Sequence, residues 1–194
     1  MKGKMRTIDL TLVAVFVALM AIGANMSFLV VGGVPITLQT FFAILAGAIL
    51  GSRIGAISMI VYALVGMVGA PVFAQFTGGI SIIIKPTFGF IISFIFVAYI
   101  VGKMIEKNRT LPSYVIASLI GMAVNYLFGT NWMYFAYNLW AGAPEGFSYK
   151  MAWLWMAAPL PKDIILSVAA AFFAHRMERT ILSRSTFRNV KKVA

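Results

Sequence analysis

Residues 34–70 read VPITLQTFFAILAGAILGSRIGAISMIVYALVGMVGA and contain a single charged residue, Arg53. Two apolar segments, 38–50 and 54–70, flank the short link Gly51-Ser52-Arg53-Ile54. Both are rich in glycine and shorter than the ~20 residues with which a helix crosses a hydrocarbon core of about 30 Å. Because small residues let helices approach closely, the stretch predicts a tight helical hairpin that packs inside a larger bundle.

The rest of the chain is equally apolar. Of its 194 residues, 61% are hydrophobic and only five are acidic. This balance excludes a water-exposed globular surface and predicts one integral membrane domain over residues 1–194. The expected fold is an all-α bundle of six transmembrane helices, followed by a basic tail over about 182–194. The predicted spans are 8–30, 38–50, 54–70, 87–105, 112–139 and 160–181.

The basic residues predict the orientation of the bundle, because cytoplasmic loops are enriched in Lys and Arg. With six spans, thirteen of the sixteen basic residues fall on one side: Lys2, Lys4, Arg6, Arg53, Lys103, Lys107, Arg109, Arg176, Arg179, Arg184, Arg188, Lys191 and Lys192. Only Lys85, Lys150 and Lys162 fall on the other side. Both termini are therefore expected in the cytoplasm. The net charge of +11 is attributed to this bias and to anionic membrane lipid, without a nucleic-acid partner.

The three predicted outer loops, 31–37, 71–86 and 141–161, are apolar, aromatic and rich in Gly and Pro. Solvated connectors are usually more polar. Irregular backbone at membrane depth persists only where it packs on protein or lines a cavity. The loops are therefore expected to fold back over a cavity at the outer side.

Asp163 is an acidic residue at the start of the last apolar segment. A charge near the bilayer interior is unfavourable by roughly 2.5–3.5 kcal/mol on insertion scales, so it needs a partner or a ligand. One interpretation is a structural ion pair with Lys85 or Lys162. The other is a binding site. Asn125 and Tyr126, in the middle of the fifth segment, allow the same two interpretations, contact between helices or contact with a ligand.

The sequence lacks the residue patterns of common enzymes. It has no cysteine and one histidine, His175, which excludes a thiolate or three-histidine metal site. It has no Walker loop, HExxH pair or GxSxG elbow. No cofactor or metal is expected on this chain, and any ATP hydrolysis would belong to another subunit.

Two small-residue patterns allow close helix contact. Ala14 and Ala18 lie four residues apart on the first segment, and Gly47, Gly51 and Gly55 repeat across the hairpin. The glycines fit internal packing at least as well as contact with a partner.

Four stretches, in order along the chain, resemble one family. They are VPITLQT with the following apolar residues to Gly79, KPTFGF (85–90), YLFGTNW (126–132) and PLPKDI (159–164). Together they resemble the biotin-specific substrate-binding subunit, or S component, of energy-coupling-factor transporters, the BioY family. The resemblance implies a six-helix membrane protein that captures biotin from outside the cell. It also implies a bacterial cell membrane, a transmembrane coupling subunit and two ABC-type ATPases that carry ATP and Mg.

The resemblance also implies residue roles. Asp163 would accept hydrogen bonds from the ureido N–H groups of biotin, and Ala14 and Ala18 would dock on the coupling subunit. The full set of candidate substrate-binding residues is Gln75, Lys85, Thr87, Asn125, Tyr126, Lys162 and Asp163. Relatives commonly have Gly in place of Lys85 and Lys162 and often a Lys in place of Leu166, so either lysine is a candidate for the basic contact. Two alternatives remain open, an S component for another vitamin and an intramembrane lipid-modifying enzyme with Asp163 as general base.

Overall fold

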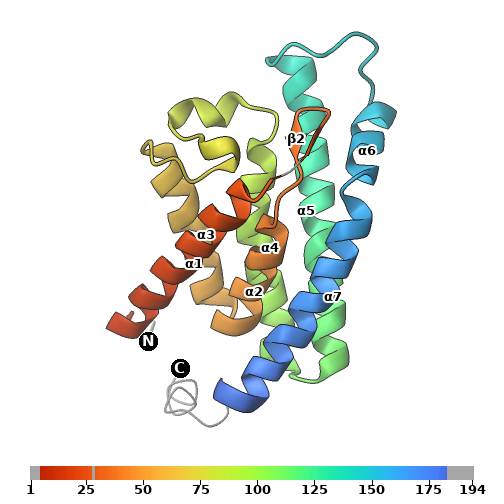
Figure 1. Ribbon diagram of the computed structural model, residues 1–194. Helices are drawn as coiled ribbons and strands as arrows, with labels where there is room; N and C mark the ends of the chain where they lie inside the picture. Colours follow the sequence, from red (N-terminus) through yellow and green to blue (C-terminus); the bar gives the residue numbers. More distant parts are fainter. Residues whose placement is uncertain (1–4, 28, 183–194) are drawn as a thin grey trace.

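The protein is a bundle of helices in the computed structural model, which describes residues 5–27 and 29–182 (Figure 1). The helices are α1 (Thr7–Asn25), α2 (Gln39–Leu50), α3 (Ser52–Met67), α4 (Phe88–Lys107), α5 (Leu111–Leu139), α6 (Tyr149–Ala157) and α7 (Leu160–Met177). Strands β1 (Val30–Val31) and β2 (Val34–Pro35) form a short antiparallel hairpin. Two 3₁₀ turns, η1 (Ala74–Phe76) and η2 (Ile80–Ile84), join α3 to α4, and a π turn, η3 (Glu178–Leu182), follows α7.

The all-α membrane fold is confirmed, and a helix overlaps each of the six predicted spans. Among the described residues, three helices are long and apolar enough to cross a membrane: α1, α4 and α5. The pair α6 and α7, bent by 56° at its break, is a fourth candidate, whereas α2 and α3 are shorter. The number of six spans therefore stays a prediction. Lys2, Lys4 and the predicted basic tail beyond residue 182 lie outside the described residues.

Two predicted boundaries are wrong. The first span was expected to reach residue 30, but α1 ends at Asn25 and the chain turns into the β1–β2 hairpin, where Gly32 and Gly33 have φ of +56° and +76°. The segment 141–161 was expected to be an irregular loop, but nine of its residues form α6. The Ser148 side chain begins this helix by accepting a hydrogen bond from the Met151 amide at 3.2 Å.

The glycines of the predicted hairpin serve internal packing. A Cβ added at Gly47 would lie 2.3 Å from the Ala98 carbonyl oxygen of α4, and one at Gly55 would lie 2.8 Å from the Ala46 carbonyl oxygen of α2. Gly51 joins α2 to α3 with φ +84°, a conformation that glycine adopts without steric cost. The hairpin prediction is confirmed, and its glycines allow α2 to lie in the centre of the bundle.

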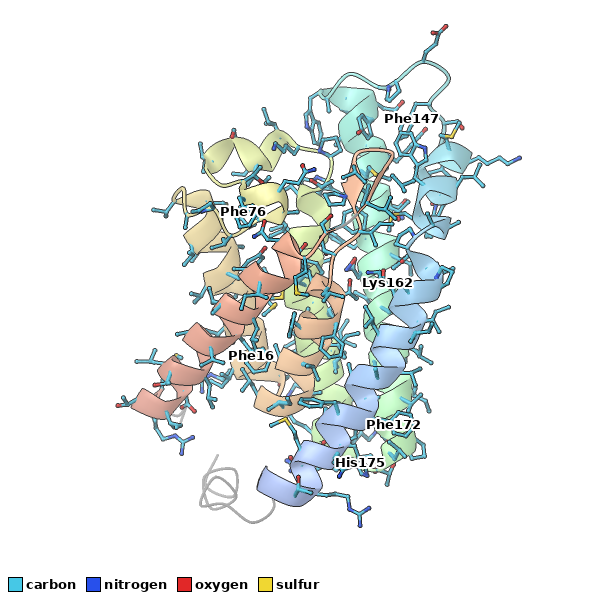
Figure 2. The ribbon with its side chains drawn as sticks, viewed as in Figure 1. Phe16, Phe76, Phe147, Lys162, Phe172 and His175 are labelled. Atoms are coloured by element: carbon cyan, nitrogen blue, oxygen red, sulfur yellow. The ribbon has the colours of Figure 1, made fainter. Side chains whose placement is uncertain are left out.

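The outer surface of the bundle is apolar, as expected of a protein surrounded by lipid. Large exposed hydrophobic side chains occur on most helices, including Leu10, Val15, Ile22, Leu64, Ile116, Leu127, Phe172 and Phe173. Figure 2 shows Phe172 on the outer side of α7.

The two ends of the bundle differ. The start of α1, the α2–α3 and α4–α5 turns and the end of α7 lie together at one end (Figure 1). These segments carry the described basic residues of the predicted cytoplasmic set: Arg6, Arg53, Lys103, Lys107, Arg109, Arg176 and Arg179. The β1–β2 hairpin, η1, η2 and α6 gather at the opposite end. The segments predicted to fold over a cavity thus lie at the end of the bundle opposite the basic residues.

Candidate functional site

A pocket lies beneath the hairpin, η1 and η2, with α2, α4, α5 and α7 as its walls. The volume of the cavity is about 140 Å³. Its lining is a mixture of apolar and polar side chains. The apolar members include Val34, Phe73, Ile82, Phe90, Ile91, Phe94 and Met156.

All seven candidate substrate-binding residues line this one pocket: Gln75, Lys85, Thr87, Asn125, Tyr126, Lys162 and Asp163. They come from four separate parts of the chain: the η1 turn, the segment just before α4, the middle of α5 and the first turn of α7. The fold thus brings together the polar groups that the sequence singled out in separate apolar segments.

Asp163 lies in the first turn of α7 with only 5% of its surface exposed. The two preceding prolines, Pro159 and Pro161, suit a helix start because proline fixes the helical φ and needs no backbone donor there. The positive end of the helix dipole favours a carboxylate at this position. Tyr126 of α5 donates a hydrogen bond to Asp163 Oδ2 at 2.7 Å. Asp163 is therefore a buried carboxylate whose orientation is fixed by a second helix.

Lys162 is the cation closest to this carboxylate. Its Nζ lies 2.7 Å from Asp163 Oδ1 and forms an ion pair with this oxygen, which contacts no other donor among the described residues. Lys162 also donates a hydrogen bond to the Thr37 carbonyl oxygen. Figure 2 shows Lys162 near the upper end of α7, where it connects this helix to the segment before α2. Lys162 thus compensates the charge of Asp163 Oδ1, and no other described donor contacts this oxygen.

Lys85 differs from Lys162 in its surroundings. It is exposed, lines the mouth of the pocket, and makes no ion pair with any described acidic residue. The suggested structural pair between Lys85 and Asp163 is therefore wrong, and the suggested pair between Lys162 and Asp163 is confirmed.

Asn125 lies deep in the pocket with 2% of its surface exposed, and its Nδ2 donates a 3.4 Å hydrogen bond to Thr40 Oγ1 of α2. The interpretation of Asn125 as a contact between helices is therefore confirmed, whereas contact with a ligand stays a prediction for this side chain of the pocket lining. Tyr126 likewise connects two helices, α5 and α7, through its bond to Asp163, and it also lines the pocket.

Sequence analysis did not place Gln39 among the site residues, although it lines the pocket. Its Oε1 accepts from Thr37 Oγ1 at 3.0 Å and its Nε2 donates to Tyr62 Oη at 2.9 Å. Tyr62 in turn donates to the Val72 carbonyl oxygen at 3.0 Å. This chain of bonds connects the entry of α2 to the loop before η1. The available signal was a polar pair, Gln39 and Thr40, at the start of an otherwise apolar helix.

The two predicted docking residues lie away from this pocket. Ala14 and Ala18 are both exposed on α1, with Val13, Phe16 and Met20 forming the buried face of the same helix. A second helix can therefore reach them without disturbing the core.

Comparison with known proteins places the chain in a family. The model of the BioY family matches residues 1–183. The protein BioYB of Bacillus subtilis is 46% identical over 191 residues, covering 95% of this chain and 94% of that protein. The biotin transporter BioY of Thermotoga maritima is 31% identical over 171 residues, covering 88% and 95%.

The fold has a counterpart among solved structures. The S component for biotin from an energy-coupling-factor type ABC transporter, a crystal structure at 2.1 Å, matches with a TM-score of 0.78 and 22% identity, covering 91% of this chain and 96% of that one. The match in fold, the family model over residues 1–183 and the identity to BioY proteins across nearly the whole chain agree, and the chain belongs to the BioY family.

Proposed function

We propose that the chain is the substrate-binding subunit of an energy-coupling-factor transporter and that its substrate is biotin. Membership of the BioY family supports this function, as do relatives named biotin transporters. Family membership also favours a transport subunit over the alternative of a lipid-modifying enzyme. By the same reasoning, a transmembrane coupling subunit and two ABC-type ATPases complete the transporter in a bacterial cytoplasmic membrane. ATP and Mg bind to those partners.

The observation that carries the proposal is the buried Asp163 carboxylate in the pocket, whose Oδ1 contacts no described donor other than Lys162. Biotin has a fused bicycle with two ureido N–H donors at one end and a valeryl carboxylate at the other. A buried carboxylate suits the ureido donors, because each of its oxygens can accept more than one hydrogen bond and charge-assisted hydrogen bonds are the stronger ones. The apolar side chains of the pocket suit the bicycle and the aliphatic tail.

The opposite end of biotin needs a cation, and Lys85 is the better candidate. Lys162 already compensates Asp163 and donates to Thr37. Lys85 lies at the pocket mouth, exposed and without a described acidic partner. We therefore assign the ureido end to Asp163 and the carboxylate end to Lys85. In this arrangement, Gln75, Thr87 and Asn125 supply the remaining polar contacts along the pocket wall.

Calorimetric titration of the purified protein in detergent tests the proposal. Biotin should bind, whereas thiamine and riboflavin should not. Asp163→Asn should weaken biotin binding by about 2–4 kcal/mol, or about 30- to 900-fold, because the ureido donors lose a charged acceptor. Asp9→Asn is the matched control. Asp9 pairs with Arg6 at the start of α1, away from the pocket lining, so this variant should bind biotin normally. Binding of another vitamin in preference to biotin would reject the substrate assignment.

A further inference from the structure

The turn over residues 73–77 has an unusual backbone. Gln75 has φ +60° and ψ +35°, and Phe76 has φ +54°. Apart from glycines, these two are the only described residues with positive φ. Side chains other than glycine rarely adopt this left-handed conformation, and it persists only where surrounding contacts enforce it. The turn lies at the pocket, since Ala74, Gln75 and Thr77 line it, whereas the Phe76 side chain is 72% exposed.

The base of the turn is fixed by packing and by its own backbone. Phe73 is 1% exposed and lies edge-on to Tyr62, with ring centroids 5.4 Å apart. It fills the space beside Gly66, where an added Cβ would lie 2.1 Å from the Phe73 ring. The Phe73 amide donates to the Thr77 carbonyl oxygen at 3.0 Å, which closes the turn. Thr77 Oγ1 also donates to the Ala74 carbonyl oxygen at 2.9 Å, so local contacts fix residues 73, 74 and 77 on either side of the two strained residues.

The tip of the turn is held from a different helix. The Phe76 amide donates a 2.6 Å hydrogen bond to Asn25 Oδ1, at the end of α1 and 51 residues earlier in the sequence. The Asn25 Nδ2 group donates to the Ala21 carbonyl oxygen at 2.9 Å, one turn back along α1. This second bond orients the amide so that its oxygen faces the turn. Figure 2 shows Phe76 at the end of the molecule where α1 meets the η1 turn.

We propose that Asn25 is a positioning residue of the substrate pocket, which holds the 73–77 turn in its left-handed conformation and thereby keeps Gln75 at the pocket wall. The effect on substrate rests on the proposed binding of biotin. The effect on the turn does not, because the hydrogen bond between Asn25 and Phe76 joins two groups of the protein itself. Asn25 does not touch the pocket, and it acts through the Phe76 amide.

Three substitutions separate this role from simple helix stability. Asn25→Leu has a similar shape and no acceptor, so it should weaken biotin binding by about tenfold, the effect of one lost hydrogen bond with the disorder that follows. Asn25→Asp keeps the acceptor and loses only the Nδ2 bond to Ala21, so it should bind within about twofold of wild type. Asn138→Ala is the control, because Asn138 makes the same kind of bond, to the Tyr134 carbonyl oxygen at 2.7 Å, on an exposed part of α5.

Amide hydrogen exchange of the ligand-free protein gives an independent readout. Peptides that cover residues 73–79 should exchange faster in Asn25→Leu than in wild type, Asn25→Asp and Asn138→Ala, with no change in the core of α4. Wild-type exchange and affinity in Asn25→Leu would overturn the inference, and so would equal losses in Asn25→Leu and Asn25→Asp. Should Asn25→Leu not fold, Asn25→Asp still decides, since a loss of affinity in that variant rejects the role of the acceptor. Failure of the wild type to bind biotin would reject the proposed function, while the exchange data would still test the turn.

Discussion

Tyr126 on α5 donates a hydrogen bond to Asp163 on α7, with 2.7 Å between Oη and Oδ2, although the residues are 37 positions apart. The bond uses one carboxylate oxygen, while the other, Oδ1, is paired with Lys162 at 2.7 Å and contacts no other described donor. A buried carboxylate with one satisfied oxygen is held in place and still available to a ligand. The arrangement therefore serves both the stability of the protein and the proposed capture of biotin.

Tyr126→Phe should weaken biotin binding by about 1–2 kcal/mol, because Asp163 loses the donor that orients it. The melting temperature of the ligand-free protein should also fall, since Oδ2 becomes a buried acceptor without a partner. Tyr114→Phe is the matched control on the same helix. Tyr114 is 1% exposed and packs against His175 at the other end of α5. Equal affinities of Tyr126→Phe and wild type would show that the hydroxyl does not orient the carboxylate.

The two pocket lysines should respond differently to substitution. Lys85→Met should weaken biotin binding by about 1.5–3 kcal/mol, the range for a hydrogen bond to a charged group. Its affinity for biotin methyl ester should match that of wild type, because the ester lacks the negative charge. Lys150→Met, an exposed lysine on α6 outside the pocket lining, is the control. If Lys85→Met still binds biotin more tightly than biotin methyl ester, as wild type should, another residue contacts the carboxylate.

Lys162→Met should instead lower the stability of the ligand-free protein. Removal of one partner of a largely buried ion pair leaves the Asp163 charge uncompensated. The loss should be about 1–3 kcal/mol, less than for a fully buried pair, because the Lys162 side chain is 31% exposed. The double variant Lys162→Met with Asp163→Asn should recover part of this stability, as measured by thermal unfolding without ligand. A double variant less stable than Lys162→Met alone would contradict the charge argument.

Ala14→Trp and Ala18→Trp should abolish ATP-dependent biotin uptake by cells and leave equilibrium binding nearly intact. A large side chain blocks close approach of a second helix, and both alanines are exposed and remote from the pocket lining. Ile116→Trp, at an exposed position on α5, is the control. Normal uptake by both alanine variants would retire the docking assignment.

Reporter fusions should place Gly146 outside the cell and a fusion after Ala194 inside it. The physical reason is the gathering of described basic residues at one end of the bundle and the pocket at the other. Alkaline phosphatase and green fluorescent protein fusions at both positions measure this. Activity from the same side at both positions would exclude the orientation with six spans.

The amino-acid sequence by itself determined the membrane environment and the position of most helices. Hydrophobic length is a local property, so the spans around α4, α5 and α7 could be predicted within a few residues, and so could the start of α1, although not its end. The importance of Asp163 was equally local, because a carboxylate in an apolar segment is costly wherever the chain folds. The glycines of residues 47–55 indicated close packing, although not the helix against which they pack.

The tertiary structure decided which side chains bond to one another. The bonds from Tyr126 to Asp163, from Lys162 to Thr37 and from Asn25 to Phe76 join residues 37, 125 and 51 positions apart, and no local pattern specifies such pairs. Helix α6 was missed for the same reason, since a short helix is marginal alone and is stabilised by packing. Trp155 supplies that packing here, because it lies against the backbone of Gly32 in the hairpin over the pocket. Which lysine compensates Asp163 and which remains free for a ligand depends on distances in space, which the sequence does not contain.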